Sequence, residues 1–313
     1  MMPRKSPAQG YCQREIFESA ILPDFLAKEH GASLPRLREA IILGGQPGAG
    51  NFALLQMIQQ ALEQHGTTWV INGDDFYACH PMRAQLRKGQ GIAATRRVDD
   101  DIRAWVAMTV DAARERGVNI ILKSTMRPLG DVVKQLNALR HSNYKVQACV
   151  LAVKEQESWQ RVHTMYEHVA ASGGYSRQIS QTMHKTDLAG LVKAVNLIET
   201  KGLVDRVVVR NRNGDLIFDN GKIKTQKLAV DAIEKECSIP FSAERIAKHT
   251  ANWNAIEGMA LQRHKREKIR PMRAAQELTA ICTQRRADEL TLNAERECAM
   301  RQVTKSTIGR ARE

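Results

Sequence analysis

The stretch GGQPGAGNF (residues 44–52) has the glycine spacing of a phosphate-binding loop but lacks the two side chains that bind phosphate and Mg²⁺. The pattern G-x-x-x-x-G-K-[S/T] is matched from Gly45 to Gly50, and Asn51 and Phe52 then replace the lysine and the Ser or Thr. The candidate phosphate-binding residues are Gly45, Gln46, Pro47, Gly48, Ala49, Gly50, Asn51 and Phe52. Backbone N–H groups of such a loop hold phosphate, the lysine contacts the terminal phosphates, and the hydroxyl binds Mg²⁺. By itself the stretch fits either a nucleotide site without its charge or a plain strand-to-helix turn.

Two aspartates form a second group with possible chemistry. Asp74 and Asp75 follow a predicted strand at 67–72, in the sequence NGDDF. A carboxylate at a strand end can accept the proton of a hydroxyl that attacks a phosphoryl group. Two acidic residues in this position can equally cap the N-terminus of a helix. Both interpretations remain open at this point.

The elements that must position these residues alternate in type along the chain. Buried strands are predicted near 40–45, 67–72, 118–124 and 145–153, with helices of about ten to eighteen residues between them. A hairpin with an Asn213-Gly214 turn follows at 205–220. This order predicts an α/β fold, a parallel sheet with helices on both faces. Ligands of such sheets bind beyond the carboxyl ends of the strands, where the glycine loop and the aspartates lie.

Composition narrows the class of protein without choosing its ligand. The 313 residues carry a net charge of +13, which attracts nucleic acid as well as nucleotides. No run of about twenty apolar residues is present, so no membrane-spanning segment is predicted. The N-terminus does not resemble a secretory signal, and six cysteines lack CxxC spacing. These features predict a cytoplasmic protein with reduced thiols and no zinc site.

The chain changes character near Cys237. Residues 241–313 have no strand pattern and carry 15 Lys and Arg against 9 Asp and Glu. We therefore predict an N-terminal helical segment (1–39), an α/β domain (40–236) and a basic helical C-terminal extension (237–313). A solvated helix pair, a nucleic-acid-binding arm and a partner-binding segment are all compatible with the extension. The expected helices make few contacts with the core of the sheet, because their apolar periodicity is weak.

Taken in order, the motifs INGDDFYACHP, KSTMR, SWQRVHTMYE and GGYSRQISQTMHK make the chain resemble the zeta toxin family over roughly residues 15 to 225. These are P-loop kinases of bacterial toxin–antitoxin systems. They phosphorylate UDP-N-acetyl amino sugars, chiefly UDP-N-acetylglucosamine, on the 3′-hydroxyl of the sugar. The resemblance implies ATP and Mg²⁺ as cofactors, a UDP-N-acetyl amino sugar as substrate and an antitoxin as protein partner.

The resemblance also implies roles for single residues. Asp74 matches the catalytic base, and Thr125 matches the threonine of the family's EGT turn, which binds the sugar. Arg161 and Arg177 match arginines that clamp the ATP phosphates, a task that suits planar, always charged guanidinium groups. Without the resemblance, surface ion pairs would be the simpler interpretation of both arginines.

Several positions depart from the family pattern and predict weakened activity. Asp75 stands where the family often has Ser or Thr, and Lys123 and Ser124 replace the Glu and Gly before Thr125. Ala107 stands where the family tends to have a Glu that faces the sugar. Lys123 ends a strand at the same crevice, so it could supply the missing positive charge or simply extend into solvent. A non-catalytic relative that binds a nucleotide, an antitoxin or another protein is the alternative.

Overall fold

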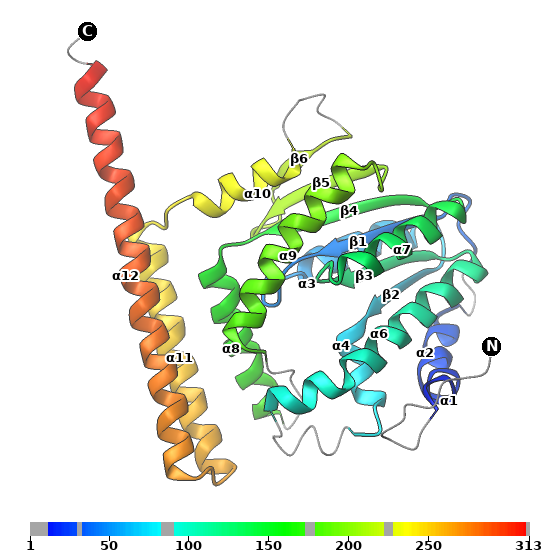
Figure 1. Ribbon diagram of the computed structural model, residues 1–313, viewed down its shortest axis with the longest axis horizontal. Coiled ribbons are helices and arrows are strands. Elements are labelled where there is room, and N and C mark those ends of the chain that lie inside the picture. Colours follow the sequence, from blue (N-terminus) through cyan, green and yellow to red (C-terminus); the bar gives the residue numbers. More distant parts are fainter. Residues whose placement is uncertain (1–11, 30–32, 83–90, 173–178, 222–227, 311–313) are drawn as a thin grey trace. The chain divides into compact units, whose positions relative to one another are not determined.

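A six-stranded sheet lies at the centre of the fold (Figure 1). The computed structural model describes residues 12–29, 33–82, 91–172, 179–221 and 228–310, with the backbone alone for 91–97 and 303–310. The strands are β1 (Glu39–Gly44), β2 (Thr68–Asn72), β3 (Asn119–Ser124), β4 (Lys145–Ala152), β5 (Arg206–Asn211) and β6 (Leu216–Asp219). Their order is β2-β3-β1-β4-β5-β6, with only β6 antiparallel to its neighbour. The predicted parallel sheet of an α/β fold is confirmed.

The register of the strands brings three carboxyl ends to one edge of the sheet. Gly44 at the end of β1 is aligned with Ser124 at the end of β3, and Asn72 at the end of β2 is aligned with Lys123. The strands are rich in aliphatic residues and are buried on both faces, as is typical of parallel sheets. The segments that follow β1, β2 and β3 therefore begin side by side.

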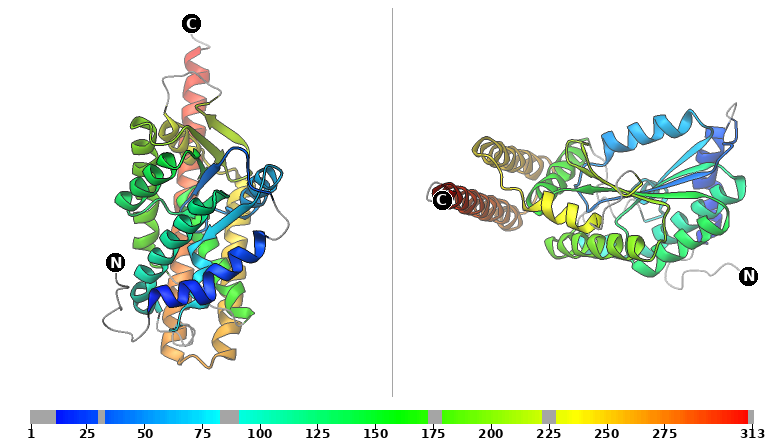
Figure 2. Two further views of the ribbon diagram at one scale, coloured as in Figure 1. Left: turned by 90° about the vertical axis from the view of Figure 1, so that its right-hand side faces the viewer. Right: turned by 90° about the horizontal axis from the view of Figure 1, so that it is seen from above.

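Helices cover both faces of the sheet (Figure 2). They include α3 (Phe52–Glu63), α4 (Gly73–Phe76), the short η3 (Tyr77–Cys79), α6 (Gly91–Arg116), α7 (Leu129–His141) and α9 (Gln181–Thr200). Leu54, Ile58 and Leu62 of α3 pack in one buried cluster with Leu43 and Ile121 of the sheet. The helices α6, α7 and α9 lie over the opposite face. The helix α6 has 26 residues and is longer than the ten to eighteen residues predicted for the helices between strands.

The N-terminal segment and the hairpin differ in detail from the predictions. Helical structure there comprises α1 (Gln13–Ile16), η1 (Phe17–Ile21), α2 (Leu22–Leu26) and η2 (Ala27–Glu29). The predicted continuation to residue 39 is wrong, because Ser33 instead accepts hydrogen bonds from the backbone and hydroxyl of Thr67. In the hairpin only Gly214 has a positive φ, and the side chain of Asn211 accepts from the N–H groups of Asn213 and Asp215.

The chain divides into two compact units. The first comprises residues 1–153 and 177–234 and contains the sheet. The second comprises residues 154–176 and 235–313, and its main helices are α8 (Glu155–Ala171), α11 (Ala243–Arg266) and α12 (Pro271–Arg310). The helix α10 (Ala229–Ser238) crosses from one unit to the other. The helix α8, predicted within the α/β domain, thus groups with the C-terminal helices.

In the second unit, α11 and α12 form an antiparallel hairpin that packs against α8 (Figure 1). The buried residues of α11 are Ile246, His249, Trp253, Ile256, Ala260, Arg263 and His264. They recur every three or four residues, as the core face of a packed helix requires. The predicted helical extension is confirmed, but the interpretation of it as a solvated pair is wrong. His249, Arg263 and His264 occupy core positions, which hides the periodicity in the sequence.

Candidate functional site

The glycine loop joins β1 directly to α3 and has the backbone of a phosphate cradle. Gly48 and Gly50 have φ values of 82° and 97°, a conformation that glycine adopts without strain. The N–H of Gly45 donates to the carbonyl of Ser124 over 3.4 Å, which ties the loop to the end of β3. The first helical bond runs from Leu55 N–H to the carbonyl of Asn51, at 2.8 Å. The N–H groups of residues 52–54 therefore have no acceptor within the helix and can hold an anion.

The two replaced loop positions supply neither a cation nor a hydroxyl group. The amide of Asn51 folds back onto Gly45, where a Cβ would lie only 3.0 Å from its Oδ1. This Oδ1 is buried and has no hydrogen-bond partner in the part of the chain that the structure describes. The ring of Phe52 is 67% exposed and cannot bind a metal ion. The cradle thus fits the phosphates of ATP through its backbone, whereas position 52 does not fit Mg²⁺.

Metal binding finds no support elsewhere in the described chain. Among those residues, no group of three or more His, Cys, Asp or Glu side chains is arranged to hold a metal ion.

None of the described helices is both long and apolar enough to cross a membrane.

The two aspartates lie in the first turn of α4. Asn72, and neither aspartate, is the N-cap: its Oδ1 accepts from the Asp74 N–H at 3.3 Å, and its Nδ2 donates to Asp75 Oδ1 at 2.9 Å. The proposed capping role of the aspartates is therefore wrong. Burial raises the pKa of the Asp75 carboxyl, and the nearby charge of Lys123 opposes this rise. The carboxylate of Asp74 takes no part in this cap.

The acidic turn is fastened to α6 by residues that sequence reasoning did not identify. Tyr77 donates to Asp99, and His80 lies 3.2 Å from Asp101. His80 Nδ1 accepts from the Met82 N–H, so its Nε2 carries the proton that faces Asp101. Burial lowers the pKa of His80, and the contact with Asp101 opposes this fall. The acidic run VDDD at 98–101 was the available signal for these contacts.

Lys123 forms an ion pair with Asp74. The distance from Lys123 Nζ to Asp74 Oδ2 is 3.2 Å, and the side chains are 31% and 55% exposed. Lys123, predicted at the sugar-binding turn, thus contacts Asp74, the predicted catalytic base. This contact was not predicted, because it joins residues 49 positions apart in the sequence.

The turn that carries Thr125 is held from both sides. Ser124 Oγ accepts from the Met126 N–H at 2.8 Å, and Met126 has a φ of 56°, which is rare for a residue with a side chain. Arg127 Nη1 lies 2.8 Å from Asp187 Oδ1 on α9. The Arg127 side chain crosses the helix at Gly190, where a Cβ would lie only 2.3 Å from its Cδ. These contacts fix the backbone on which Thr125 is placed.

The structure brings some of the predicted site residues together and does not place others. The glycine loop, Asp74, Asp75, Lys123 and Thr125 all follow or end strands at the same edge of the sheet. Ala107 is exposed on α6. Arg161 lies on α8, in the second unit, and Arg177 lies outside the described residues. The assignment of both arginines to the phosphates stays a prediction.

A cavity of about 730 Å³ lies beside β2 and is distinct from the glycine loop. Gln59 and Glu63 of α3, Thr68 and Val70 of β2, and Asp75 contribute to its lining. Of the predicted site residues, Asp75 alone reaches it. The cavity contains charges of both signs, since Lys28 and Glu63 both line it.

The sequence of the chain is similar to those of known toxins. The model of the zeta toxin family matches residues 29–223. Toxin PezT of Streptococcus pneumoniae serotype 4 is 23% identical over 228 residues, which cover 72% of this chain and 88% of that protein. Toxin zeta of Streptococcus agalactiae is 23% identical over 212 residues, which cover 66% of this chain and 71% of that protein.

Solved structures show the same fold. A structure from the PezAT chromosomal toxin–antitoxin system of Streptococcus pneumoniae has a TM-score of 0.66 at 21% identity, covering 77% of this chain and 96% of that chain. The AvrRxo1-ORF1:AvrRxo1-ORF2 structure with sulphate ions has a TM-score of 0.51 at 12% identity, covering 90% and 88%. Because the family model spans well over half of the sequence, this chain belongs to the zeta toxin family of P-loop kinases.

Proposed function

We propose that this protein transfers the γ-phosphate of ATP to the 3′-hydroxyl of a UDP-N-acetyl amino sugar, with weakened activity. The observation that carries the proposal is the position of Asp74 at the same sheet edge as the glycine loop, with only β3 between the strands that lead to them. Phosphoryl transfer needs an anchored phosphate and a nucleophile whose proton has an acceptor. The edge offers both features.

Each residue of the site has a definite task in this reaction. The backbone N–H groups of residues 52–54 hold the phosphates of ATP, and Asp74 accepts the proton of the sugar hydroxyl. The hydroxyl oxygen forms a bond to the γ-phosphorus, and the bond from that phosphorus to the ADP oxygen breaks. Thr125 contacts the sugar, and Arg161 and Arg177 spread the charge that develops on the phosphates. In the family Mg²⁺ adds charge neutralisation, for which Phe52 offers no ligand.

Weakened activity follows from the side chains at positions 51 and 52. Removing one preorganised electrostatic donor from an active site typically lowers the rate by about 10²–10³. Asn51 brings no charge, and Phe52 brings no hydroxyl group. Lys123 also holds the carboxylate that must receive the proton. We therefore expect slow transfer rather than none.

A non-catalytic protein that binds a nucleotide or a protein partner is the second candidate. The ion pair between Lys123 and Asp74 favours it, because the carboxylate that would contact the sugar hydroxyl is already in contact with a cation. An antitoxin is the partner that we propose, since the similar PezAT protein comes from a toxin–antitoxin system. No surface of this chain is assigned to that partner.

Calorimetric titration with ATP and with UDP-N-acetylglucosamine tests the proposal. Binding of both, with each still bound in the presence of the other, is the expected result. Binding of ATP alone would favour the non-catalytic candidate. If neither ligand binds, the kinase proposal fails and the glycine loop is a structural turn.

A further inference from the structure

Lys123 lies between the two halves of the proposed reaction site. It is on β3, whose neighbours are β1, which leads into the glycine loop, and β2, which leads to Asp74. In the register of the sheet, Lys123 is aligned with Leu43 on one side and with Asn72 on the other. The next carbonyl along β3, that of Ser124, accepts from the N–H of Gly45 in the loop. Lys123 is thus the last residue but one of β3, the strand that lies between the strand leading to the glycine loop and the strand leading to Asp74.

The side chain of Lys123 lies on the face of the sheet that α3 covers. Alternate residues of a strand share a face, so Lys123 points to the same side as Ile121. Ile121 packs in one buried cluster with Leu43 and with Leu54 and Ile58 of α3. The helix α3 begins directly after the glycine loop. The stem of Lys123 therefore leaves β3 on the face that α3 covers, and its ammonium group contacts Asp74.

We propose that Lys123 supplies the cation for the terminal phosphates of the nucleotide, in place of the lysine that Asn51 replaces. This inference rests on the proposed nucleotide site. The ion pair of Lys123 with Asp74 is partly exposed, and such pairs hold weakly. A polyphosphate carries several negative charges where Asp74 carries one, so the ammonium group exchanges the carboxylate for the phosphates. That exchange also releases Asp74 to receive a proton.

Titration of the full chain with three probes tests this role. Inorganic tripolyphosphate and ATP each carry a chain of three phosphates, whereas AMP carries only the α-phosphate. In Lys123→Met, affinity for tripolyphosphate and ATP should fall about tenfold, the loss of one charge-assisted contact, while affinity for AMP stays within about threefold. The matched control is Lys145→Met, which removes the same charge from the exposed first residue of β4, at the opposite edge of the sheet. Its affinities should equal those of the wild type.

A second variant tests whether a lysine at position 51 can replace Lys123. Asn51→Lys in the Lys123→Met background should restore ATP affinity about tenfold, whereas Asn51→Lys in the wild type should add less, because one cation is already present. Equal ATP affinities in Lys123→Met and Lys145→Met would overturn the inference while leaving the nucleotide site intact. If the wild type binds none of the three probes, the proposed function fails together with the inference.

A measurement on the wild type covers the case in which Lys123→Met does not fold. In protein with ¹³C-labelled lysine side chains, the Cε resonance of Lys123 is assigned by its disappearance in Lys123→Arg. Saturating tripolyphosphate should shift this resonance, and saturating AMP should not. An unchanged Lys123 resonance in saturating tripolyphosphate would contradict the inference.

Discussion

Asn51 determines how the glycine loop differs from that of an efficient kinase. Its amide lies against Gly45, so no charged group extends from the start of α3 over the loop. Restoring both side chains, Asn51→Lys with Phe52→Thr, should raise ATP affinity, but by less than the roughly ten- to a hundredfold of one full charge-assisted contact of about 1.5–3 kcal/mol, because Lys123 already supplies one cation. Phosphoryl transfer should rise with it, because the hydroxyl restores a Mg²⁺ ligand. Calorimetry and a transfer assay measure the two effects.

The separate single variants control for this restoration. The lysine and the metal ion share the charge of the phosphates, so neither Asn51→Lys nor Phe52→Thr alone should reproduce the rise in transfer. A double variant that binds ATP without any transfer would place the main defect at Lys123 and Ala107, on the sugar side. A double variant with no affinity for ATP would contradict the nucleotide site itself.

His163 links the stability of the second unit to pH. Its ring lies between Trp159 and Trp253, with centroid distances of 4.7 and 5.3 Å. Burial lowers its pKa to about 4, against the opposing charges of Glu277 and Asp288. The folded protein therefore keeps His163 neutral, while the unfolded chain takes up a proton below about pH 6.5. The free energy of unfolding should fall by up to about 3 kcal/mol as the pH drops from about 6.5 to 4.

Urea denaturation of two histidine variants isolates this effect. His163→Leu should flatten the decline in unfolding free energy between about pH 6.5 and pH 4. His168→Leu removes an exposed histidine from the same helix and should leave the decline as it is in the wild type. Equal pH dependence in the two variants would show that His163 titrates normally.

At the scale of elements, a buried ion pair joins α11 to α8. Arg263 donates to both carboxylate oxygens of Glu167, at 2.9 and 3.0 Å, and the two side chains are 4% and 3% exposed. Arg263 also pairs with Glu277 of α12. Burial alone would lower the pKa of Arg263, but the hydrogen bond to Glu167 and the two negative charges raise it. The three helices are thus held partly by one guanidinium group that contacts carboxylates of two of them.

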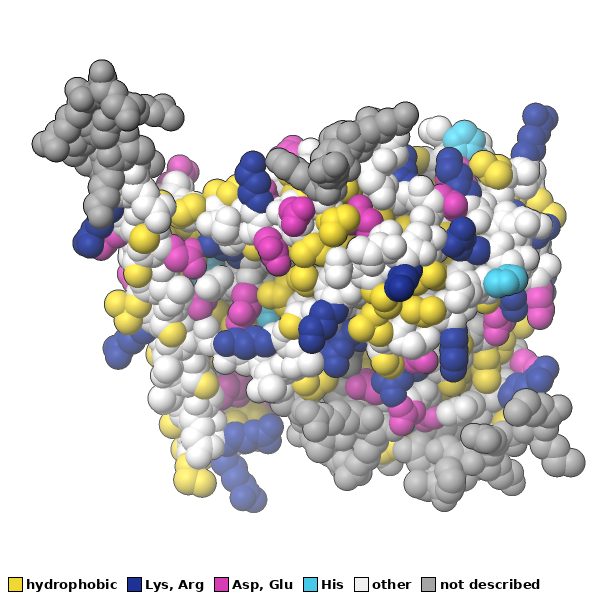
Figure 3. Space-filling model, turned by 45° about the horizontal axis from the view of Figure 1, so that its top comes forward, with side chains coloured by type: hydrophobic (Ala, Val, Ile, Leu, Met, Phe, Trp, Pro, Cys, Tyr) yellow, Lys and Arg dark blue, Asp and Glu magenta, His cyan; other side chains and the backbone are white. Residues whose placement is uncertain are grey.

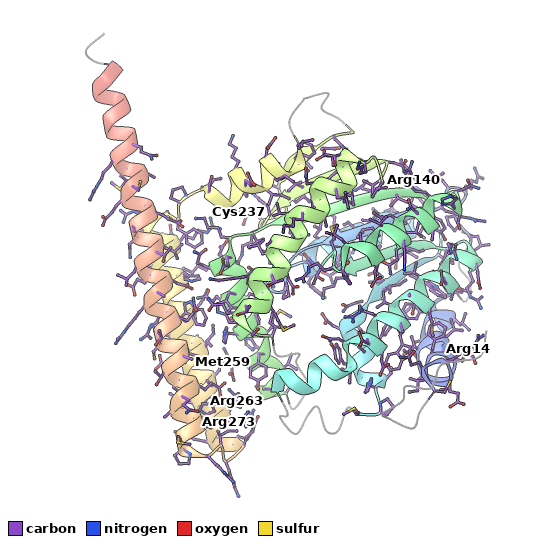
Figure 4. All side chains as sticks on the ribbon, in the orientation of Figure 1. Arg14, Arg140, Cys237, Met259, Arg263 and Arg273 are labelled. Atoms are coloured by element: carbon purple, nitrogen blue, oxygen red, sulfur yellow. The ribbon has the colours of Figure 1, made fainter. Side chains whose placement is uncertain are left out.

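Removing this guanidinium should destabilise the helical unit. Arg263→Met leaves the carboxylate of Glu167 buried without its partner, which should cost about 3–5 kcal/mol of unfolding free energy. Arg273→Met is the matched control: Arg273 is exposed at the start of α12, and Figure 4 labels both arginines. That variant should stay within about 0.5 kcal/mol of the wild type. Equal losses in the two variants by urea denaturation would contradict the structural role of the pair.

The sequence predicted elements well where a continuous run of apolar residues marks them. The strands at 40–45, 118–124 and 145–153 are short aliphatic runs, and each lies within a residue or two of its observed position. The packing of α11 was missed because His249 and Arg263 fill positions that usually hold apolar residues. Such positions are explained only by partners on other helices, such as Asp288 and Glu167. A single sequence does not reveal these partners.

At the scale of the molecule, the contacts of the site depend on the order of the strands. The sequence places the glycine loop, Asp74 and Lys123 after or within separate strands, but nothing in it states that β3 lies between β1 and β2. The resemblance to the family supplied the proposed roles of Asp74 and Thr125, whereas the pairing of Lys123 with Asp74 required the register. Long-range register of this kind is what residue patterns do not determine.

The net charge of +13 could attract nucleic acid. On the face drawn in Figure 3, Lys and Arg side chains are interspersed with Asp and Glu among the described residues. In the second unit, Arg245 and Arg263 are engaged with Glu157 and Glu167. Neither observation adds support to the overall charge for a nucleic-acid-binding role.

Transfer of labelled γ-phosphate from ATP to UDP-N-acetylglucosamine tests the proposed activity most directly. Wild-type protein should form a 3′-phosphorylated product slowly, and Asp74→Asn should lower the rate by about 10² or more while ATP remains bound. Asp75→Asn, which changes the neighbouring carboxylate, should retain most of the wild-type rate. Transfer that is equally fast in wild type and Asp74→Asn would contradict the account, and so would a wild type that binds both ligands without forming product.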